Sequence, residues 1–182
     1  MLIDFQNKKI FAISDTHGKH RDIIVPNADI IIHCGDVCSD GNMEEIIDFF
    51  SWFENLDIKN KIFVAGNHDL IFDLEPNVAK NLIPNNVILL ENSSVIIDGI
   101  KFFSLAVRPY VNLDYKLEKD IDVLITHGPP FGILDEGIGC KILMDIVTEI
   151  NPKLHIFGHI HSGSNSKEIH NNIQFFNTCI SY

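Results

Sequence analysis

Residues 61–69 read KIFVAGNHD, an apolar run that passes directly into a polar cluster. The run is rich in β-branched and aromatic side chains and is followed by glycine, which is typical of a buried strand. The same arrangement recurs at residues 9–18 (KIFAISDTHG), 29–36 (DIIIHCGD), 121–128 (IDVLITHG) and 153–161 (KLHIFGHIH). We therefore predict five buried strands, each of which ends in polar side chains.

Helices are predicted between these strands. Residues 42–56 carry apolar side chains at helical spacing, with Asn42 as the N-cap and Glu45 three residues later, as in a capping box. Residues 140–150 show a second amphipathic pattern, which Asn151-Pro152 ends. The alternation of strands and helices predicts an α/β fold.

The middle of the chain has a different pattern. Residues 87–106 contain short β-type runs, and Asp98-Gly99 between two of them is a strong hairpin signal. No linker, repeat or low-complexity segment divides the sequence. We expect residues 1–182 to form one domain.

Composition limits the classes of partner. The chain has 182 residues, is 46% hydrophobic and has a formal net charge of −11, which disfavours extended binding to a nucleic-acid backbone. Residues 1–11 are too polar for a signal peptide, and no apolar run is long enough to cross a membrane. The four cysteines, Cys34, Cys38, Cys140 and Cys179, form no CxxC pair and indicate free thiols in a reducing cytoplasm.

The polar clusters at the strand ends share one chemistry. Carboxyl ends of neighbouring parallel strands meet at one edge of a sheet, where α/β proteins bind ligands. That edge would gather two aspartates, one asparagine and five histidines, namely Asp15, Asp36, Asn67, His17, His68, His127, His159 and His161. Carboxylate, amide and imidazole groups suit Zn, Mn, Fe or Co, and the number of donors exceeds what one catalytic ion needs. The sequence thus predicts a site for two metal ions.

Each motif alone would be weak evidence for metal binding. A lone Asp-x-His or Gly-Asp is usually a solvated turn or a helix cap, and a lone His-x-His is more often structural. His33 and His155 lie beside or inside strands, and we interpret them as packing residues or as supports for the site. The prediction depends on five strand-end clusters occurring together.

The order and spelling of the clusters resemble the calcineurin-like metallophosphoesterase family, whose signature runs D-x-H, GD, GNH-D/E, a strand-end H and GHxH. All five blocks are present, at residues 15–17, 35–36, 66–69, 127 and 158–161. Residues 126–130, 139–140 and 152–161 further resemble the small class III cyclic-nucleotide-phosphodiesterase-like branch, which includes metallophosphoesterase-domain proteins. The resemblance implies a four-layer α/β/β/α sandwich.

The resemblance also implies that seven side chains hold two divalent ions, with Mn favoured over Fe, Zn and Co. They are Asp15, His17 and His161 for the first ion, Asn67, His127 and His159 for the second, and Asp36 as a bridge between the two. A metal-bridging hydroxide would attack the phosphorus of a small phosphate ester. We therefore expect a metal-dependent phosphoric ester hydrolase.

His68 is not counted among the ligands, and we expect it to act as the general acid, with Asp36 catalytic as the bridge. Many relatives carry an aspartate after GD that orients this histidine. Here Asp40 lies one place later than in the commonest pattern. Asp40, Asp69 and Ser39 are all candidates for the orienting residue.

Three cationic or titratable side chains are candidates for contact with the phosphate or the leaving group. His20 and Arg21 follow the first cluster, and Arg108 follows a predicted strand. A solvated surface role is equally compatible with each of them.

A phosphodiesterase acting on small phosphodiesters, cyclic nucleotides among them, is the favoured function. A phosphomonoesterase or protein phosphatase is the main alternative, because the metal core is common to these activities. A non-catalytic interaction scaffold is less favoured, since all expected ligands and His68 are present. The sequence leaves the oligomeric state open.

Overall fold

A computed structural model describes residues 1–107 and 118–180 of the chain. The strands are β1 (Leu2–Phe5), β2 (Lys8–Ile13), β3 (Ile30–His33), β4 (Asn60–Phe63), β5 (Val87–Leu89), β6 (Ser93–Ile97), β7 (Ile100–Ser104), β8 (Val123–Ile125), β9 (Leu154–Phe157), β10 (Ser166–His170) and β11 (Ile173–Asn177). The helices are α1 (Met43–Glu54), α2 (Ile71–Leu74), α3 (Pro76–Leu82) and α4 (Lys141–Ile150), with single turns η1 (His20–Asp22) and η2 (His161–Gly163).

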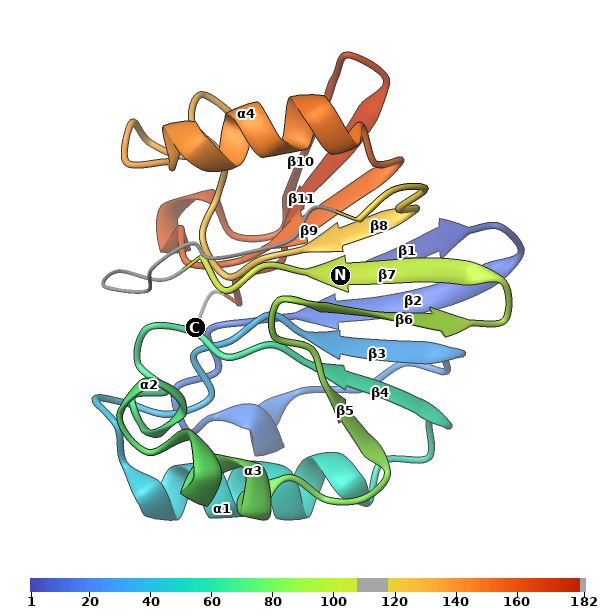
Figure 1. The fold of residues 1–182 in the computed structure, drawn as a ribbon. Coiled ribbons are helices and arrows are strands. Elements are labelled where there is room, and N and C mark those ends of the chain that lie inside the picture. Colours follow the sequence, from blue (N-terminus) through green and yellow to red (C-terminus); the bar gives the residue numbers. More distant parts are fainter. Residues whose placement is uncertain (108–117, 181–182) are drawn as a thin grey trace.

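The strands form two sheets that lie in the middle of the molecule (Figure 1). The first has the order β1-β2-β3-β4-β5, and the second has the order β10-β11-β9-β8-β7-β6. Strands β2 to β5 are parallel to one another, as are β7, β8, β9 and β11. The remaining strands β1, β6 and β10 pair antiparallel at sheet edges. Most carboxyl ends within each sheet therefore point the same way.

The alternation of side chains along each central strand builds three apolar layers. In β3, Ile30 and Ile32 face the core between the sheets, where they meet residues of the second sheet such as Ile125. Ile31 points the other way and joins the cluster that contains Phe49 of α1. A third cluster packs α4 against the second sheet.

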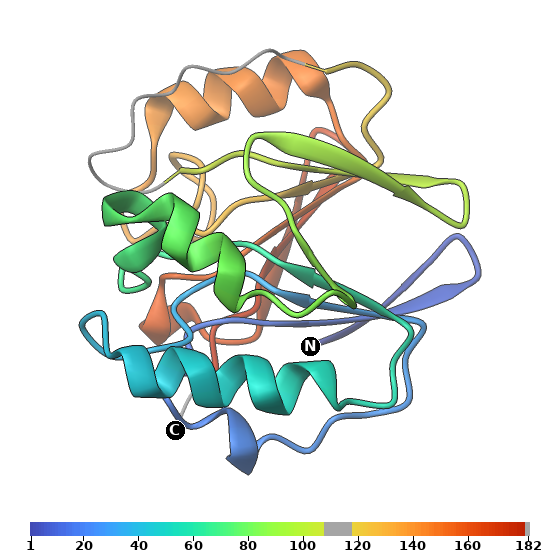
Figure 2. The ribbon, with the colours of Figure 1, turned by 60° about the horizontal axis from the view of Figure 1, so that its bottom comes forward.

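Helices cover both outer faces of the paired sheets. Helices α1, α2 and α3 lie beside the first sheet and α4 beside the second, and Figure 2 shows α1 and α4 on opposite sides of the molecule. The four-layer α/β/β/α sandwich that the family resemblance implies is confirmed.

The two predicted helices are present, and each has a local cap. Asn42 accepts hydrogen bonds from two backbone N–H groups of the first turn of α1, as predicted. Glu45 differs from a capping box, because its carboxylate accepts a hydrogen bond from the backbone N–H of Ser39 at 2.6 Å. Helix α4 has the Cys140 thiol at its N-cap and ends at Asn151, whose φ is 49°.

Three two-residue turns join antiparallel strands. Asp98-Gly99 has φ angles of 51° and 84° and closes the β6–β7 hairpin, which confirms the prediction there. Gln6-Asn7 and Asn171-Asn172 also have positive φ angles and close the β1–β2 and β10–β11 hairpins. The sequence analysis did not predict β1 or β10.

The carboxyl ends of the central strands of both sheets meet at one edge of the molecule. A parallel bridge pairs Ser14, just after β2, with Cys179, just after β11. The backbone N–H of Gly158 donates to the carbonyl of His127 at 2.9 Å, so the ends of β8 and β9 are also joined. Within the described ranges, no helix has the length and apolar character of a membrane span.

Candidate metal centre and active site

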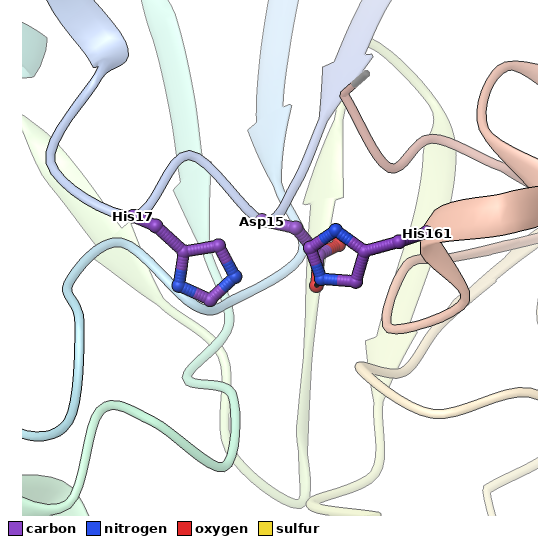
Figure 3. Close-up of side chains that lie close together, drawn as sticks. All are labelled: Asp15, His17 and His161. Atoms are coloured by element: carbon purple, nitrogen blue, oxygen red, sulfur yellow. Dashed lines mark ion pairs between the residues drawn. The ribbon is translucent and has the colours of Figure 1, made fainter. Parts of the chain in front are cut away.

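The first group of donors lies where β2 and β9 end. Asp15, His17 and His161 each offer an oxygen or nitrogen atom, and these atoms lie within 4.8 Å of one another (Figure 3). Asp15 and His17 have φ angles of 57° and 41°, which turn the chain sharply after β2. These two side chains come from the first sheet, and His161 comes from the loop after β9 of the second.

The Asp15 carboxylate has one satisfied oxygen and one unsatisfied oxygen. Oδ2 accepts hydrogen bonds from the Ser14 hydroxyl at 2.5 Å and from the His159 backbone N–H at 2.9 Å. Oδ1 is buried, has no hydrogen-bond partner among the described residues, and lies 3.7 Å from His161 Nε2. A buried carboxylate oxygen without a partner is costly, and a bound cation would satisfy it.

Two of the imidazole rings are oriented by backbone carbonyl groups. His17 Nδ1 lies 3.0 Å from the carbonyl oxygen of Cys38, and His127 Nδ1 lies 2.8 Å from that of Cys34. A carbonyl oxygen only accepts, so Nδ1 is the donor in both rings. In the neutral form of either ring, the Nε2 lone pair is then free to bind a metal ion.

The second group of donors lies beside the first. Ligand atoms of Asp36, His127 and His159 are within 4.8 Å of one another. His127 Nε2 lies 3.2 Å from Asp36 Oδ2 and 3.0 Å from the side-chain oxygen of Asn67. Because the backbone of His159 binds Asp15, the two groups adjoin.

Burial and charge oppose each other in the second group. Burial favours a raised pKa for Asp36, but His127 and the His68 backbone N–H outweigh it and hold that pKa below its usual value. Burial disfavours charge on His127, but Asp36 outweighs it and raises the pKa of His127 to about 9. Burial, followed by the nearby His127, lowers the pKa of His159. A cation bound here would replace the proton that His127 shares with Asp36.

Asp69 joins the loops that carry Asp36 and Asn67. Its buried carboxylate accepts three backbone hydrogen bonds, from Asp36 at 2.9 Å, Val37 at 2.9 Å and Gly66 at 2.8 Å. The prediction that Asp69 could orient His68 is therefore corrected, because both of its oxygens are bound to backbone N–H groups.

Asp40 contacts the candidate general acid. His68 Nδ1 lies 3.1 Å from Asp40 Oδ1, and the His68 ring packs edge-on against His17 with centroids 5.1 Å apart. The His68 side chain is 37% exposed, so it can reach a bound substrate. Of the three candidates for the orienting residue, the structure places Asp40 in contact with the ring.

Two of the predicted substrate contacts have another partner. His20 Nε2 lies 3.0 Å from the Asp48 carboxylate, and Arg21 forms two hydrogen bonds with the same group. The His20 ring is fully buried and packs against Phe49 and Trp52. The prediction of substrate contact is therefore wrong for the buried His20 ring, while Arg21 is engaged by Asp48. Arg108 lies outside the described residues.

Several supporting groups were not identified from the sequence. They are the Ser14 hydroxyl, the carbonyls of Cys34 and Cys38, and the three-bond role of Asp69. Backbone carbonyls leave no compositional signal. Asp69 stands in the GNHD cluster, so its position was visible but its partners were not.

Comparison with known proteins decides the family. The sequence profile described as Calcineurin-like phosphoesterase matches residues 8–163, which carry all the donors described above. The chain belongs to the calcineurin-like phosphoesterase family. The family is one of metal-dependent phosphoester hydrolases, and the donor groups agree with that class.

Relatives of this calcineurin-like phosphoesterase are known in animals. It is 37% identical over 183 residues to UPF0046 protein K07C11.7 of Caenorhabditis elegans, with 84% of this chain and 63% of the relative covered. It is 33% identical over 198 residues to Metallophosphoesterase domain-containing protein 1 of Homo sapiens, with 85% and 61% covered. The chain thus spans less than two thirds of the length of these curated relatives.

A solved structure shares the fold. Phosphopantetheinyl Hydrolase (PptH) from Mycobacterium tuberculosis matches with a TM-score of 0.70 over 95% of this chain and 89% of that one. The sequence identity is 16%, so the match shows the fold alone.

Proposed function

We propose that this protein is a phosphodiesterase that hydrolyses small phosphodiesters, cyclic nucleotides among the candidates, and that it uses two divalent metal ions. One observation carries the proposal. Two adjoining groups of carboxylate and imidazole donors, from strand ends far apart in the sequence, meet at one edge of the paired sheets. The family places such a site in phosphoester hydrolysis.

The donor set fits two ions. Asp15, His17 and His161 would hold one, His127, His159 and Asn67 would hold the other, and Asp36 would serve both. The unsatisfied Oδ1 of Asp15 supports this fit. Mixed oxygen and nitrogen donors without a thiolate favour Mn, Fe, Co or Zn, and we favour Mn. When bound, the ions supply an activated water near neutral pH and neutralise charge on the phosphate.

The chain itself supplies proton transfer and positioning. His68 would give a proton to the departing alkoxide, and its Nδ1 is held by Asp40 so that Nε2 faces away from that carboxylate. The second oxygen of Asp36 accepts the His68 backbone N–H at 2.8 Å, which fixes the acid relative to the donor groups. One aspartate thereby links the candidate ligands to the candidate acid.

The surroundings of the donors favour a diester over a monoester as the substrate. His68 lies beside the first donor group, and a separate cavity opens beside the second. The partly exposed His68 on one side of the donors and the cavity on the other favour a phosphorus with two organic substituents. A phosphomonoesterase or protein phosphatase remains the alternative, since the donors do not distinguish these activities.

A matched substrate panel tests the proposal. It comprises a bis-aryl phosphate diester, an aryl monoester, 2′,3′- and 3′,5′-cyclic nucleotides, a phosphopeptide and single-stranded DNA, each assayed with Mn²⁺. We expect a higher kcat/KM for diesters than for the monoester, and little activity on DNA because of the net charge of −11. A preference for the monoester or the phosphopeptide would overturn the proposal of a diesterase.

Two substitutions distinguish metal binding by Asp36 from proton donation by His68. Asp36→Asn should lower kcat/KM by at least about 100-fold and reduce the content of both metals, measured by elemental analysis. His68→Asn should keep both metals and lower kcat by about 100-fold or more for an alkoxide leaving group, such as that of a cyclic nucleotide. It should have a smaller effect on a 4-nitrophenyl ester, because nitrophenolate departs without a proton.

Other outcomes would contradict these roles. Equal losses for both leaving groups in His68→Asn would argue against a general acid. Wild-type turnover by Asp36→Asn would refute the two-metal assignment. Absence of metal after growth with Mn²⁺ would favour a non-catalytic scaffold.

The proposal extends to the cellular compartment and to the partner. All four cysteines are free thiols, and three are buried, which agrees with a reducing compartment such as the cytoplasm. We propose a small phosphate ester as the partner, and neither a membrane nor an extended nucleic acid.

A further inference from the structure

A cavity of about 240 Å³ opens beside the second donor group. One side of it is formed by three candidate ligands, Asn67, His127 and His159. The rest of the lining is Val107, Gly128, Pro129, Ile138 and Cys140. Any phosphate held by the donors would therefore have this cavity next to it.

The lining residues other than the ligands form an apolar wall. Valine, proline, isoleucine and cysteine side chains face the space, and no lysine, arginine, aspartate or glutamate occurs among its described lining residues. A closed cavity of roughly 150 Å³ is enough for benzene. The space is thus large enough for an aromatic ring, and none of the lining residues that the structure describes is a cation that could bind a second phosphate.

The loop that contributes Ile138 and Cys140 to this wall is held by hydrogen bonds to one carboxylate. Asp135 accepts hydrogen bonds from the backbone N–H groups of Gly132 at 2.8 Å, Gly137 at 3.1 Å and Gly139 at 3.1 Å. A bridge between Pro130 and Cys140 closes the neck of the loop. Ile138 is 68% exposed, although it stands on this ordered loop. A large apolar side chain presented on a preorganised loop is suited to ligand contact.

The cavity and the candidate acid lie beside different donor groups. His68 packs against His17 of the first group, and neither His68 nor Asp40 is among the described residues that line the cavity. The leaving group must lie within reach of His68. The group that occupies the cavity is therefore the ester substituent that stays on phosphorus.

We propose that this cavity binds the retained substituent of the phosphodiester, and that it selects an apolar group, an aromatic ring foremost, over a small one. The inference rests on the proposed function, because it takes the donors to hold the phosphate. It adds the substrate class: diesters with a ring on the retained side.

Two diesters with the same leaving group test the proposal. Phenyl 4-nitrophenyl phosphate and methyl 4-nitrophenyl phosphate differ only in the retained substituent, and both release 4-nitrophenolate. We expect kcat/KM to be about 10-fold or more higher for the phenyl diester. Ile138→Ala should lower kcat/KM about 5-fold for the phenyl diester and leave the methyl diester within 2-fold.

A charged variant and a matched control sharpen the test. Ile138→Glu should reduce kcat/KM for the phenyl diester by about 10-fold or more, because it places a carboxylate where the ring would lie. Ile142→Ala removes a side chain of similar exposure, 56%, from helix α4, and Ile142 is not among the described residues that line the cavity. This variant should leave kcat/KM unchanged for both diesters. An unchanged phenyl-to-methyl ratio in both Ile138 variants would overturn the proposal.

A second readout does not depend on turnover. Cys140 is the one cysteine that is not buried, so iodoacetamide should alkylate it first. In protein loaded with Mn²⁺, phenyl phosphate should slow this alkylation at least about 5-fold, and methyl phosphate should not, as followed by mass spectrometry. Failure of phenyl phosphate to protect Cys140 would overturn the cavity assignment even if the diesters are hydrolysed. Protection without hydrolysis would refute the proposed function and leave the cavity assignment supported.

Discussion

Asp40 and Asp69 show how similar residues near one histidine have separate tasks. Asp40 is exposed and contacts the ring of His68, whereas Asp69 is buried and holds three backbone N–H groups. Burial and the neighbouring Asp36 raise the pKa of Asp69, although its backbone hydrogen bonds oppose that shift. The first aspartate is suited to orienting the acid and the second to holding the loops together.

Asp69→Asn should therefore lower stability, and Asp40→Asn should lower turnover. An amide at position 69 presents N–H groups to backbone donors, so the free energy of unfolding in urea should fall by about 2–4 kcal/mol. Asp40→Asn should change that free energy by less than about 0.5 kcal/mol and reduce kcat about 10-fold for alkoxide leaving groups. The reverse pattern in the two variants would show that these roles are exchanged.

Position 158 has room only for glycine, because any side chain there would collide with Asp15 and Ser14. A Cβ at this position would lie 2.5 Å from Asp15 Oδ2 and against the Ser14 hydroxyl. Gly158→Ala should displace the Asp15 carboxylate and lower the metal content of the first site. Elemental analysis should show a loss of bound metal, with the far-UV circular dichroism unchanged.

Gly128→Ala is the matched control for metal content. Among the described residues, the nearest atom to a Cβ there is the Val107 carbonyl oxygen at 3.5 Å, which is an ordinary contact. This variant should bind metal as the wild type does. Equal metal content in the Gly158 and Gly128 variants would contradict the steric argument.

At the scale of elements, the loop before α4 is a structured unit that a single buried carboxylate organises. Burial opposes the charge of Asp135, but the N–H groups of Gly132, Gly137 and Gly139 outweigh it and lower the pKa of Asp135. The loop therefore keeps its shape at neutral pH without a helix or strand of its own.

Asp135→Ala should loosen this wall and reduce discrimination between diesters. We expect the ratio of kcat/KM values for the phenyl and methyl diesters to fall about 5-fold, with the value for the methyl diester nearly unchanged. Asp145→Ala, on the exposed face of α4, removes the same charge and is the control. A similar fall in the control would assign the effect to charge and not to the loop.

At the scale of the whole molecule, each sheet has a buried histidine hydrogen-bonded to a threonine behind its candidate metal-binding loop. In the first sheet, His33 Nε2 lies 3.1 Å from the Thr16 hydroxyl, and its Nδ1 accepts the Gly35 backbone N–H. In the second, His155 Nε2 lies 2.9 Å from the Thr126 hydroxyl, which donates to the Gly128 carbonyl. Both rings therefore carry the proton on Nε2 and donate to a threonine beside a candidate ligand.

These two histidines should make the metal-free protein sensitive to acid. Burial lowers the pKa of His155 to about 3 and also lowers the pKa of His33. Below pH 6.5 the unfolded chain binds protons that the folded chain does not, so stability falls as the pH falls. Between pH 6.5 and 5, the free energy of unfolding in urea with a chelator should fall by about 2 kcal/mol through His155, and His33 should add to this fall.

His155→Gln is the control for this pH dependence. The variant removes one titrating ring, so the slope of stability against pH in this range should be shallower than that of the wild type. Equal slopes in the variant and the wild type would show that His155 does not contribute.

The sequence by itself determined the elements whose signals are local. The central strands are uniformly apolar because both of their faces are buried, Asn42 and Asp98-Gly99 carry their own cap and turn chemistry, and each candidate ligand stands at a strand end. The edge strands β1 and β10 were not found, because exposed edges need little apolar alternation.

Only the tertiary structure decided which distant groups meet. Asp48 of α1 engages His20 and Arg21, and Asp40 rather than Asp69 contacts His68. The unsatisfied Asp15 oxygen and the apolar cavity likewise exist only after both sheets are packed together. Side-chain type and local order are encoded along the chain, whereas these contacts depend on how separate strand ends are brought together in space.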